Sequence, residues 1–341
     1  MDLALHTEQL TKTYRRRVSK PGLWGSIAGL FANQVKEVPA VKRLDLSVRL
    51  GERVGLIGEN GAGKSTTLKM LTGILVPSAG SLRVLGKEPW RERRSLAREI
   101  GVVFGQRPQL LWDIPVRETF RLLKTMYDVP AAIYDVTYTE AVRRLELSPL
   151  LGVPVRQLSL GQRMRCDLAA SLLHAPKIAF LDEPTIGLDV SVKEQVREFI
   201  RDMQQRFGIT LLITTHDLKD ITETCDRLLL LDRGELLFDG SMPEFERRFG
   251  SGRRIRFELE KAVPAQALPE LSAALAALGG KLGESGPHQL KVEYEREGAA
   301  PQLIQLVMAR LSVVDIALEK ADIEGVVARI YRRQAAANAS E

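Results

Sequence analysis

The chain has 341 residues, 49 Lys and Arg against 43 Asp and Glu, a net charge of +6, and a content of 45% hydrophobic and 27% charged residues. This ordinary globular mixture excludes a disordered, collagen-like or disulfide-stapled chain, and the length predicts two domains or one large domain with an appendage. The two cysteines, Cys166 and Cys225, favour a reducing compartment. No apolar run reaches the roughly 18–20 residues that span a bilayer, and the N-terminus does not resemble a secretory signal, so we expect a soluble, cytoplasmic protein.

The first 250 residues alternate short apolar runs with longer amphipathic segments, which is typical of a layered α/β domain. Several of the apolar runs are continuous in Val, Ile and Leu, as expected for strands that are covered on both faces. The predicted strands are Leu44–Leu50, Arg53–Ile57, Ile100–Val103, Ile178–Leu181, Thr210–Thr214 and Arg227–Leu231. We therefore predict an α/β domain over residues 1–250.

The segment from Asp113 to Leu173 contains no convincing strand. Its apolar spacing predicts consecutive helices at Val116–Tyr127, Tyr138–Leu145 and Gly161–Leu173. We expect a helical subdomain at about residues 108–173, inserted into the α/β scaffold.

The composition changes after Gly250-Ser251-Gly252, which is the predicted joint between two domains. Beyond it the predicted strands are Arg254–Leu259, Gln289–Tyr294 and Val313–Glu319, and the predicted helices are Leu268–Leu278, Ala300–Leu311 and Asp322–Arg333. This pattern predicts a small α+β domain over residues 251–333, followed by a frayed tail at 334–341.

A glycine-rich loop at residues 58–66 matches G-x-x-x-x-G-K-[ST] and stands between a predicted strand and the amphipathic segment Thr66–Leu75. Its glycines allow backbone N–H groups to turn inward as an anion nest, and the helix N-terminus adds its dipole. In this motif, Lys64 supplies a positive charge to the β- and γ-phosphates, and the Ser65 hydroxyl ligates Mg²⁺. The predicted nucleotide-binding residues of the loop are Gly58, Asn60, Gly61, Ala62, Gly63, Lys64, Ser65 and Thr66.

A second element ends in two carboxylates. The apolar strand at 178–181 leads directly into Asp182 and Glu183. Asp182 at the strand end is placed to bind Mg²⁺ through water, and Glu183 to polarise a water molecule that attacks the γ-phosphate. Together with the glycine-rich loop, this pair indicates a nucleotide-hydrolysing site.

Further motifs occur in the order found in the ATP-binding subunits of ABC transporters, which this sequence resembles over about residues 3–245. Residues 158–163, Leu-Ser-Leu-Gly-Gln-Arg, are similar to the ABC signature motif. Gln106 resembles the glutamine of the Q-loop, residues 186–189 resemble the D-loop, and residues 214–217 resemble the switch-histidine motif. Tyr14 occupies the position of the aromatic residue that stacks on adenine.

The resemblance implies an ATPase with a P-loop NTPase core of the ABC type, a helical insertion, and ATP and Mg²⁺ as cofactors. It implies that Glu183, His216 and Gln106 are catalytic, with His216 hydrogen-bonded to the γ-phosphate, and that Gln106 joins Ser65 and Asp182 at the metal. The nucleotide contacts outside the glycine-rich loop would come from Tyr14, Ser159, Gly161, Gln162 and Asp189.

One residue departs from the commonest signature motif, because Leu160 stands where glycine is usual. Ser159 and Gly161, whose hydroxyl and backbone N–H would face the phosphate, are retained, so we expect activity to survive. The family geometry is a head-to-tail dimer, in which the signature helix of one subunit covers ATP on the other. We therefore expect a second ATPase subunit, with a homodimer favoured, and poor hydrolysis by a monomer.

Transport would also require a separate membrane permease, so we expect the protein to lie on the inner face of the cell membrane. The resemblance implies that residues 106–113, including an exposed Leu110, Leu111 and Trp112, form an apolar socket for a cytoplasmic helix of that permease. Two features resemble the ATPases of drug, antibiotic and polysaccharide exporters more than those of importers. They are the residue types at positions 183–189 and 214–217, and the short C-terminal domain. Neither the cargo nor the role of the C-terminal domain is legible from the sequence.

An extension separates Tyr14 from the strand at Leu44, where family members usually have a short turn. Within it, the segment Gly22–Phe31 has aromatic and aliphatic residues at helical spacing next to basic residues. It could cover the edge of the protein's own sheet, or it could touch lipid headgroups or a partner.

The alternative function, of a different class, is a soluble ABC ATPase that acts on nucleic acid or ribosomes. The absence of a long coiled coil, the single ATPase cassette and the modest charge speak against it. We expect no nucleic-acid partner.

Overall fold

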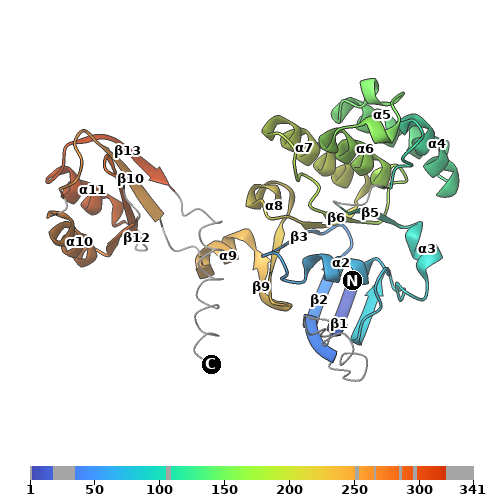
Figure 1. The fold of residues 1–341 in the computed structure, drawn as a ribbon, viewed down its shortest axis with the longest axis horizontal. Helices are drawn as coiled ribbons and strands as arrows, with labels where there is room; N and C mark the ends of the chain where they lie inside the picture. The colour runs from blue at the N-terminus through green and yellow to red at the C-terminus, as the bar shows by residue number, and fades with distance from the viewer. Residues whose placement is uncertain are drawn as a thin grey trace, which may run out of the picture. The chain divides into compact units, whose positions relative to one another are not determined.

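The computed structural model describes residues 2–17, 35–104, 109–249, 253–264, 266–283, 286–294 and 298–319. The chain divides into two compact units, Met1–Ser241 and Met242–Glu341 (Figure 1). The second unit starts with α9 (Met242–Phe249), so the division precedes the joint that the sequence predicts at Gly250. The predicted helix at 322–333 and the tail at 334–341 lie outside the described residues. Within the described ranges, no helix is both long and apolar enough to cross a membrane.

A six-stranded sheet forms the centre of the first unit (Figure 1). In spatial order its strands are β5 (Ile100–Phe104), β6 (Ile178–Asp182), β7 (Thr210–Thr214), β3 (Arg53–Gly58), β8 (Arg227–Asp232) and β9 (Glu235–Ser241). Neighbouring strands are parallel except for β9, which pairs antiparallel with β8. The five parallel strands confirm the strands that the sequence predicts there, whereas β9 was not predicted.

The parallel strands are buried on both faces, as their continuous apolar runs predict. In β6, Ile178 and Phe180 belong to one hydrophobic core, and the alternate residues Ala179 and Leu181 belong to another. The central sheet therefore separates two cores, and its functional groups lie at the strand ends.

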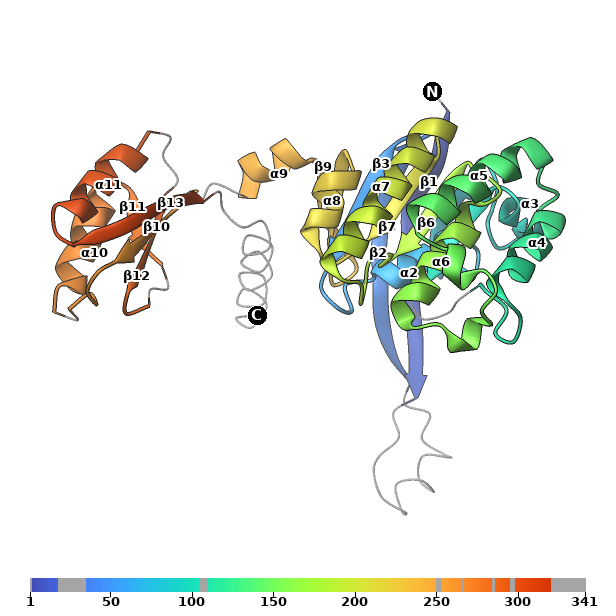
Figure 2. The same ribbon diagram turned by 90° about the horizontal axis from the view of Figure 1, so that it is seen from above.

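Helices cover one face of this sheet (Figures 1 and 2). They are α4 (Val116–Met126), α5 (Ala131–Arg144), α6 (Leu160–Leu172) and α7 (Val190–Phe207). The first three confirm the predicted run of consecutive helices, although α5 begins directly after Pro130, earlier than the sequence suggested. Helix α7 was not predicted.

The other core lies between the parallel sheet and a three-stranded antiparallel sheet (Figure 1). The small sheet has the order β2 (Val35–Arg49), β1 (Leu3–Arg17) and β4 (Ala79–Val84), and its core also takes in α2 (Lys64–Leu71) and α3 (Arg93–Ala97). The predicted strand at Leu44 is the second half of β2. Because β1 and β2 pair along their whole length, both ends of the extension between Tyr14 and Leu44 are strand. The proposed helix at 22–31 lies outside the described residues.

The second unit contains a four-stranded antiparallel sheet (Figure 2). Its order is β11 (Gly280–Leu282), β12 (Gln289–Tyr294), β10 (Arg253–Leu259) and β13 (Val313–Glu319). Helices α10 (Leu268–Ala277) and α11 (Ala300–Met308) pack on one face of this sheet around Phe257, Leu275 and Leu303. The three predicted strands and the first two predicted helices are present, which agrees with an α+β unit.

Candidate functional site

The glycine-rich loop joins β3 to α2, in the strand–loop–helix context that its motif requires. Gly63 is the N-cap of α2 and has φ 106°, and a Cβ atom at this position would lie 2.5 Å from the carbonyl oxygen of Ala40. A Cβ on Gly58 would lie 2.7 Å from the carbonyl oxygen of Leu231. The loop can therefore follow this path only with glycine at both positions, and the resulting cradle fits a phosphate chain.

Lys64 follows Gly63 in this cradle, and its residue is only 7% exposed. Its Nζ donates to the carbonyl oxygens of Gly58, at 2.5 Å, and Glu59, at 3.2 Å. Among the described residues it forms no ion pair. Burial lowers the pKa of Lys64, while the nearby carboxylates of Glu183 and Asp182 raise it. A buried ammonium group that is held only by backbone carbonyls is suited to an anionic ligand, so the residues present fit the phosphates of ATP.

The carboxyl ends of β6 and β7 bring the other predicted groups to the same edge of the sheet. Asp182 ends β6 and stands opposite Thr214 at the end of β7, whose hydroxyl donates to Asp182 Oδ1 at 2.5 Å. Since β7 also pairs with β3, the end of β7 lies between the glycine-rich loop and the two acids at the same edge of the sheet. In open parallel sheets this edge is where ligands bind.

Glu183 adopts a left-handed backbone conformation, with φ 53°, which costs a residue other than glycine about 1–3 kcal/mol. Its backbone N–H donates to the carbonyl oxygen of Thr214 at 2.9 Å. Its Oε2 atom lies 3.1 Å from Nδ1 of His216, and the His216 side chain is 63% exposed. Glu183 and His216, two of the three predicted catalytic residues, are therefore neighbours.

Two of the three predicted metal ligands lie among the described residues. Ser65 lies exposed in the first turn of α2, and Asp182 is half-buried at the end of β6. Mg²⁺ is ordinarily held by one or two protein ligands together with substrate phosphates and water, and Ser65 and Asp182 supply that number of oxygens. The third predicted ligand, Gln106, lies outside the described residues.

The signature segment forms the N-terminus of α6, as predicted. Ser159 is the N-cap and makes a capping box with Gln162: its Oγ accepts from the Gln162 N–H at 3.2 Å, and Gln162 Oε1 accepts from the Ser159 N–H at 3.0 Å. Leu160 is exposed, and it packs beside Gly187, while Gly161 packs beside Leu188. The signature and D-loop segments therefore form one surface. No hydrogen bond or ion pair among the described residues joins this segment to the glycine-rich loop.

Two other predicted residues lie away from these contacts. Asp189 is the exposed N-cap of α7. Tyr14 lies on β1 with its ring exposed, and Nζ of Lys12 stands 5.6 Å from the ring centre. An exposed, electron-rich ring leaves a face free for stacking, which is compatible with the adenine role.

The predicted apolar socket is corrected at one residue. Leu110 is 4% exposed and belongs to the core of the helical region, whereas Leu111 and Trp112 are exposed as expected. The cause is Asp167 of α6, whose Oδ1 accepts from the Gln109 N–H at 2.6 Å and so fixes the chain with Leu110 turned inward. The Trp112 ring is covered on one side by the guanidinium of Arg163, 4.5 Å from its centre.

Asp167 also gives a prediction for stability. Burial raises its pKa from 3.8 to about 7, and backbone hydrogen bonds from Gln109 and Leu110 oppose this rise. Because the folded state binds the proton more tightly than the unfolded state, the free energy of unfolding should fall as the pH rises from about 4 to 7 and then level off. Asp167→Asn is expected to remove this dependence and to raise stability at pH 8, on the order of 3 kcal/mol at most.

Denaturant unfolding of Asp167→Asn and wild type at pH 5 and pH 8 checks this expectation. Asp113→Asn is the matched control, because Asp113 is exposed and, within the described ranges, pairs only with the exposed Arg156. Equal pH dependence in Asp167→Asn and wild type would show that this carboxyl stays ionised in the fold.

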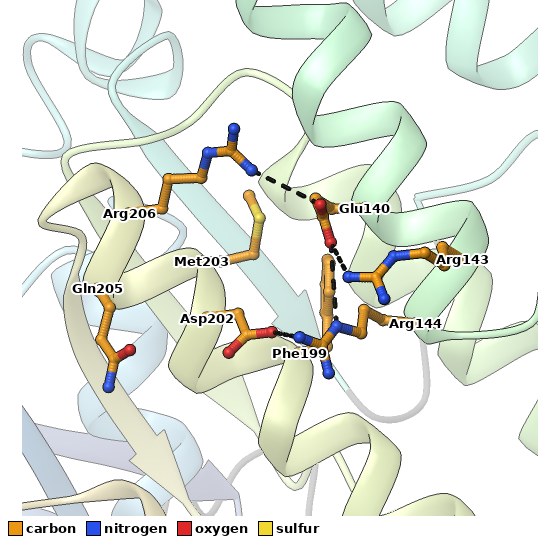
Figure 3. A pocket seen from close by; sticks show the side chains of 8 residues that line it. All are labelled: Glu140, Arg143, Arg144, Phe199, Asp202, Met203, Gln205 and Arg206. Carbon is orange, nitrogen blue, oxygen red and sulfur yellow. Dashed lines mark hydrogen bonds and ion pairs between the residues drawn. The ribbon is translucent and has the colours of Figure 1, made fainter.

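A cavity of about 340 Å³ lies between α5 and α7 (Figure 3). Glu140 points toward Arg143, at 2.6 Å, and Arg206, at 3.6 Å, while Asp202 pairs with Arg144 at 2.5 Å. The remaining lining residues are Phe199, Met203 and Gln205. Each carboxylate that lines the cavity is already paired with arginine. The cavity is therefore part of an ion-pair network between two helices and not part of the nucleotide site.

Sequence reasoning assigned no role to three side chains that the structure places behind the catalytic groups. They are Arg197 of α7 and Asp220 of α8 (Leu218–Thr224), which pair at 3.0 Å in the interior, and Thr185, which donates to Asp220 at 2.5 Å. A charged residue on a helix gives no sign in sequence of being buried, so only the proximity of Thr185 to Glu183 could have drawn attention to it.

Comparisons with known proteins agree with this geometry. The family model described as ABC transporter matches residues 41–186. The daunorubicin resistance ATP-binding protein DrrA3 of Streptomyces coeruleorubidus is 34% identical, covering 70% of this chain and 73% of its own length. The methionine import ATP-binding protein MetN of Caulobacter vibrioides is 32% identical with the same two coverages. Relatives of differing transport role thus match about equally, so the expected closeness to exporters is supported only in part.

A solved structure shares the fold. The structure of cbiO1 from Clostridium perfringens, described as part of the ABC transporter complex cbiONQ, has a TM-score of 0.57 and 26% identity, and covers 72% of this chain and 92% of its own. The phosphate cradle, the paired carboxylates and the signature helix thus occur together in a fold and a sequence that known ATP-binding subunits share. The chain belongs to the family of ATP-hydrolysing, ATP-binding proteins of ABC transporters.

Proposed function

We propose that this protein is the ATPase subunit of a membrane export complex and that it works as a head-to-tail dimer. The observation that carries this is a phosphate cradle whose lysine has no carboxylate partner among the described residues. Lys64 is buried and forms no ion pair there, while Ser65, His216 and the signature residue Ser159 are exposed. A helix N-terminus with free N–H groups suits a γ-phosphate. Helix α2 supplies one such N-terminus at the glycine-rich loop, and the N-terminus of α6 from a second copy can supply another.

Each site residue has a chemical task in this proposal. Lys64 and the glycine-rich loop hold the phosphates. Ser65, Asp182 and Gln106 would hold Mg²⁺, which when bound would neutralise charge on the phosphates. Glu183 takes the proton of the attacking water, and His216 orients that water and the γ-phosphate. Tyr14 stacks on adenine. The additional contacts to the nucleotide come from the partner copy, through its Ser159, Gly161, Gln162 and Asp189.

The partner in the membrane would be a separate permease, with this protein on the inner face of the membrane. Leu111 and Trp112 are exposed at the start of the helical region, and they offer an apolar surface to a permease helix. Similarity to a drug-resistance ATP-binding protein supports export. The transport-related names of the relatives favour this role over a soluble ATPase that acts on nucleic acid or ribosomes.

Two measurements test the proposal. Turnover per subunit should rise steeply with protein concentration, because only the dimer completes the site, and it should stay constant if one chain is sufficient. Solubilised native membranes should yield the protein together with an integral membrane permease. Co-purification with ribosomes or DNA, and no permease, would contradict the transport role and leave the ATPase assignment intact.

A further inference from the structure

An arginine is enclosed behind the catalytic groups. Arg197 of α7 has a side chain only 2% exposed, and its guanidinium meets three carboxylates. Nη1 lies 3.0 Å from Asp220 Oδ1, Nη2 lies 3.0 Å from Glu194 Oε2, and Nε lies 2.8 Å from Glu223 Oε2. Asp220 is equally buried, with 2% exposure. Buried ion pairs stabilise a fold little compared with apolar residues of the same volume, so there must be another reason why Arg197 and Asp220 are buried here.

The second oxygen of Asp220 supplies that reason. Oδ2 accepts from the Thr185 hydroxyl at 2.5 Å and from the Thr215 hydroxyl at 2.9 Å. Thr185 comes two residues after Glu183, and Thr215 immediately precedes His216. One carboxylate therefore ties together the loop that follows β6 and the loop that follows β7, and Arg197 fixes that carboxylate from the opposite side.

The two catalytic side chains need such a tie. Glu183 holds a left-handed backbone conformation that the surrounding structure has to enforce. His216 is mostly exposed, so little packing orients it, and it meets Glu183 at 3.1 Å. The Thr215 hydroxyl also accepts from the Asp217 N–H at 3.0 Å, which sets the turn that carries His216.

We propose that Asp220, anchored by Arg197, is a positioning residue for ATP hydrolysis: through Thr185 and Thr215 it holds Glu183 and His216 in one geometry. This inference rests on the proposed roles of Glu183 and His216. Because its side chain is only 2% exposed, Asp220 is not placed to touch nucleotide or water itself. It acts through the backbone of the two loops, so its loss should affect the chemical step and not nucleotide binding.

The test removes the hydroxyls and leaves the buried ion pair intact. Thr185→Val and Thr215→Val keep the shape of the side chain, and each is expected to lower kcat about tenfold or more with KM and Kd for ATP within about twofold of wild type. Thr185→Ser and Thr215→Ser retain the hydroxyl and should restore most of the rate. Thr222→Val is the control, because among the residues that the structure describes its exposed hydroxyl bonds only within α8, to the carbonyl oxygen of Lys219.

Unchanged kcat in both valine variants would overturn the inference, and so would a loss that serine does not rescue. A second arm uses the Glu183→Gln background, where Thr185→Val should cause no further loss if it acts through Glu183. A full additional tenfold loss there would contradict positioning. If Glu183→Gln itself turns over at the wild-type rate, the proposed function fails instead, whatever the threonine variants show.

Discussion

Glu183→Gln is expected to lower the rate of ATP hydrolysis by about 10²–10⁴-fold, while ATP still binds and the dimer still closes. The amide has the shape of the carboxylate and can keep the contact with Nδ1 of His216, but it cannot take a proton from water. Lys64 and the glycine-rich loop are untouched, so nothing that holds the phosphates is lost. Closed dimers should therefore accumulate because the step that reopens them is blocked.

Phosphate release at saturating ATP, equilibrium binding of a fluorescent nucleotide, and light scattering with and without ATP measure the three parts of this prediction. Glu118→Gln is the matched control, because Glu118 is an exposed residue of α4 whose one ion-pair partner in the described part of the chain is Arg121, and it should hydrolyse ATP like wild type. Rapid phosphate release by Glu183→Gln would show that another group takes the proton. Loss of binding would show that Glu183 supports the cradle and not the chemistry.

The chemistry of the site could be read from sequence because each part is local. The loop at 58–66, the strand ending in Asp182, and Ser159 ahead of α6 each combine a short residue pattern with one type of backbone element. The parallel sheet then brings these pieces to one edge, since the carboxyl ends of β3, β6 and β7 are neighbours. Knowledge of the strand order was not needed to find the pieces.

What the sequence did not reveal depends on contacts between distant segments. Leu110 reads as an exposed apolar residue, and it is buried because Asp167, 57 residues later, holds the adjacent backbone. Arg197 reads as one charge among many on α7, and it is buried because Asp220 and Glu223 lie one turn apart on α8 and face it. The strand β4 was missed because it buries only two side chains, so alternation along it is weak.

The glycine-rich loop is expected to tolerate alanine at one of its glycines far better than at another. Gly63→Ala should lower the free energy of unfolding by about 3 kcal/mol or more and abolish nucleotide binding, because φ 106° is unfavourable for alanine and its Cβ would lie 2.5 Å from the carbonyl oxygen of Ala40. Gly61 also has positive φ, 89°, but a Cβ there meets nothing within 4 Å. Gly61→Ala should therefore cost only about 1 kcal/mol, the conformational penalty alone.

The neighbourhood of Gly63 explains why the clash cannot relax. The Lys42 N–H donates to the carbonyl oxygen of Gly234 at 2.7 Å, and the Gly234 N–H donates to that of Ala62 at 3.0 Å. These bonds hold β2, the turn after β8 and the phosphate loop against one another, so moving Ala40 away would break at least one of them. Urea unfolding of both variants without nucleotide separates the steric penalty at Gly63 from the conformational penalty that alanine carries at both positions. Equal losses would show that the loop yields at Gly63, and that glycine is needed there for the phosphate and not for the packing.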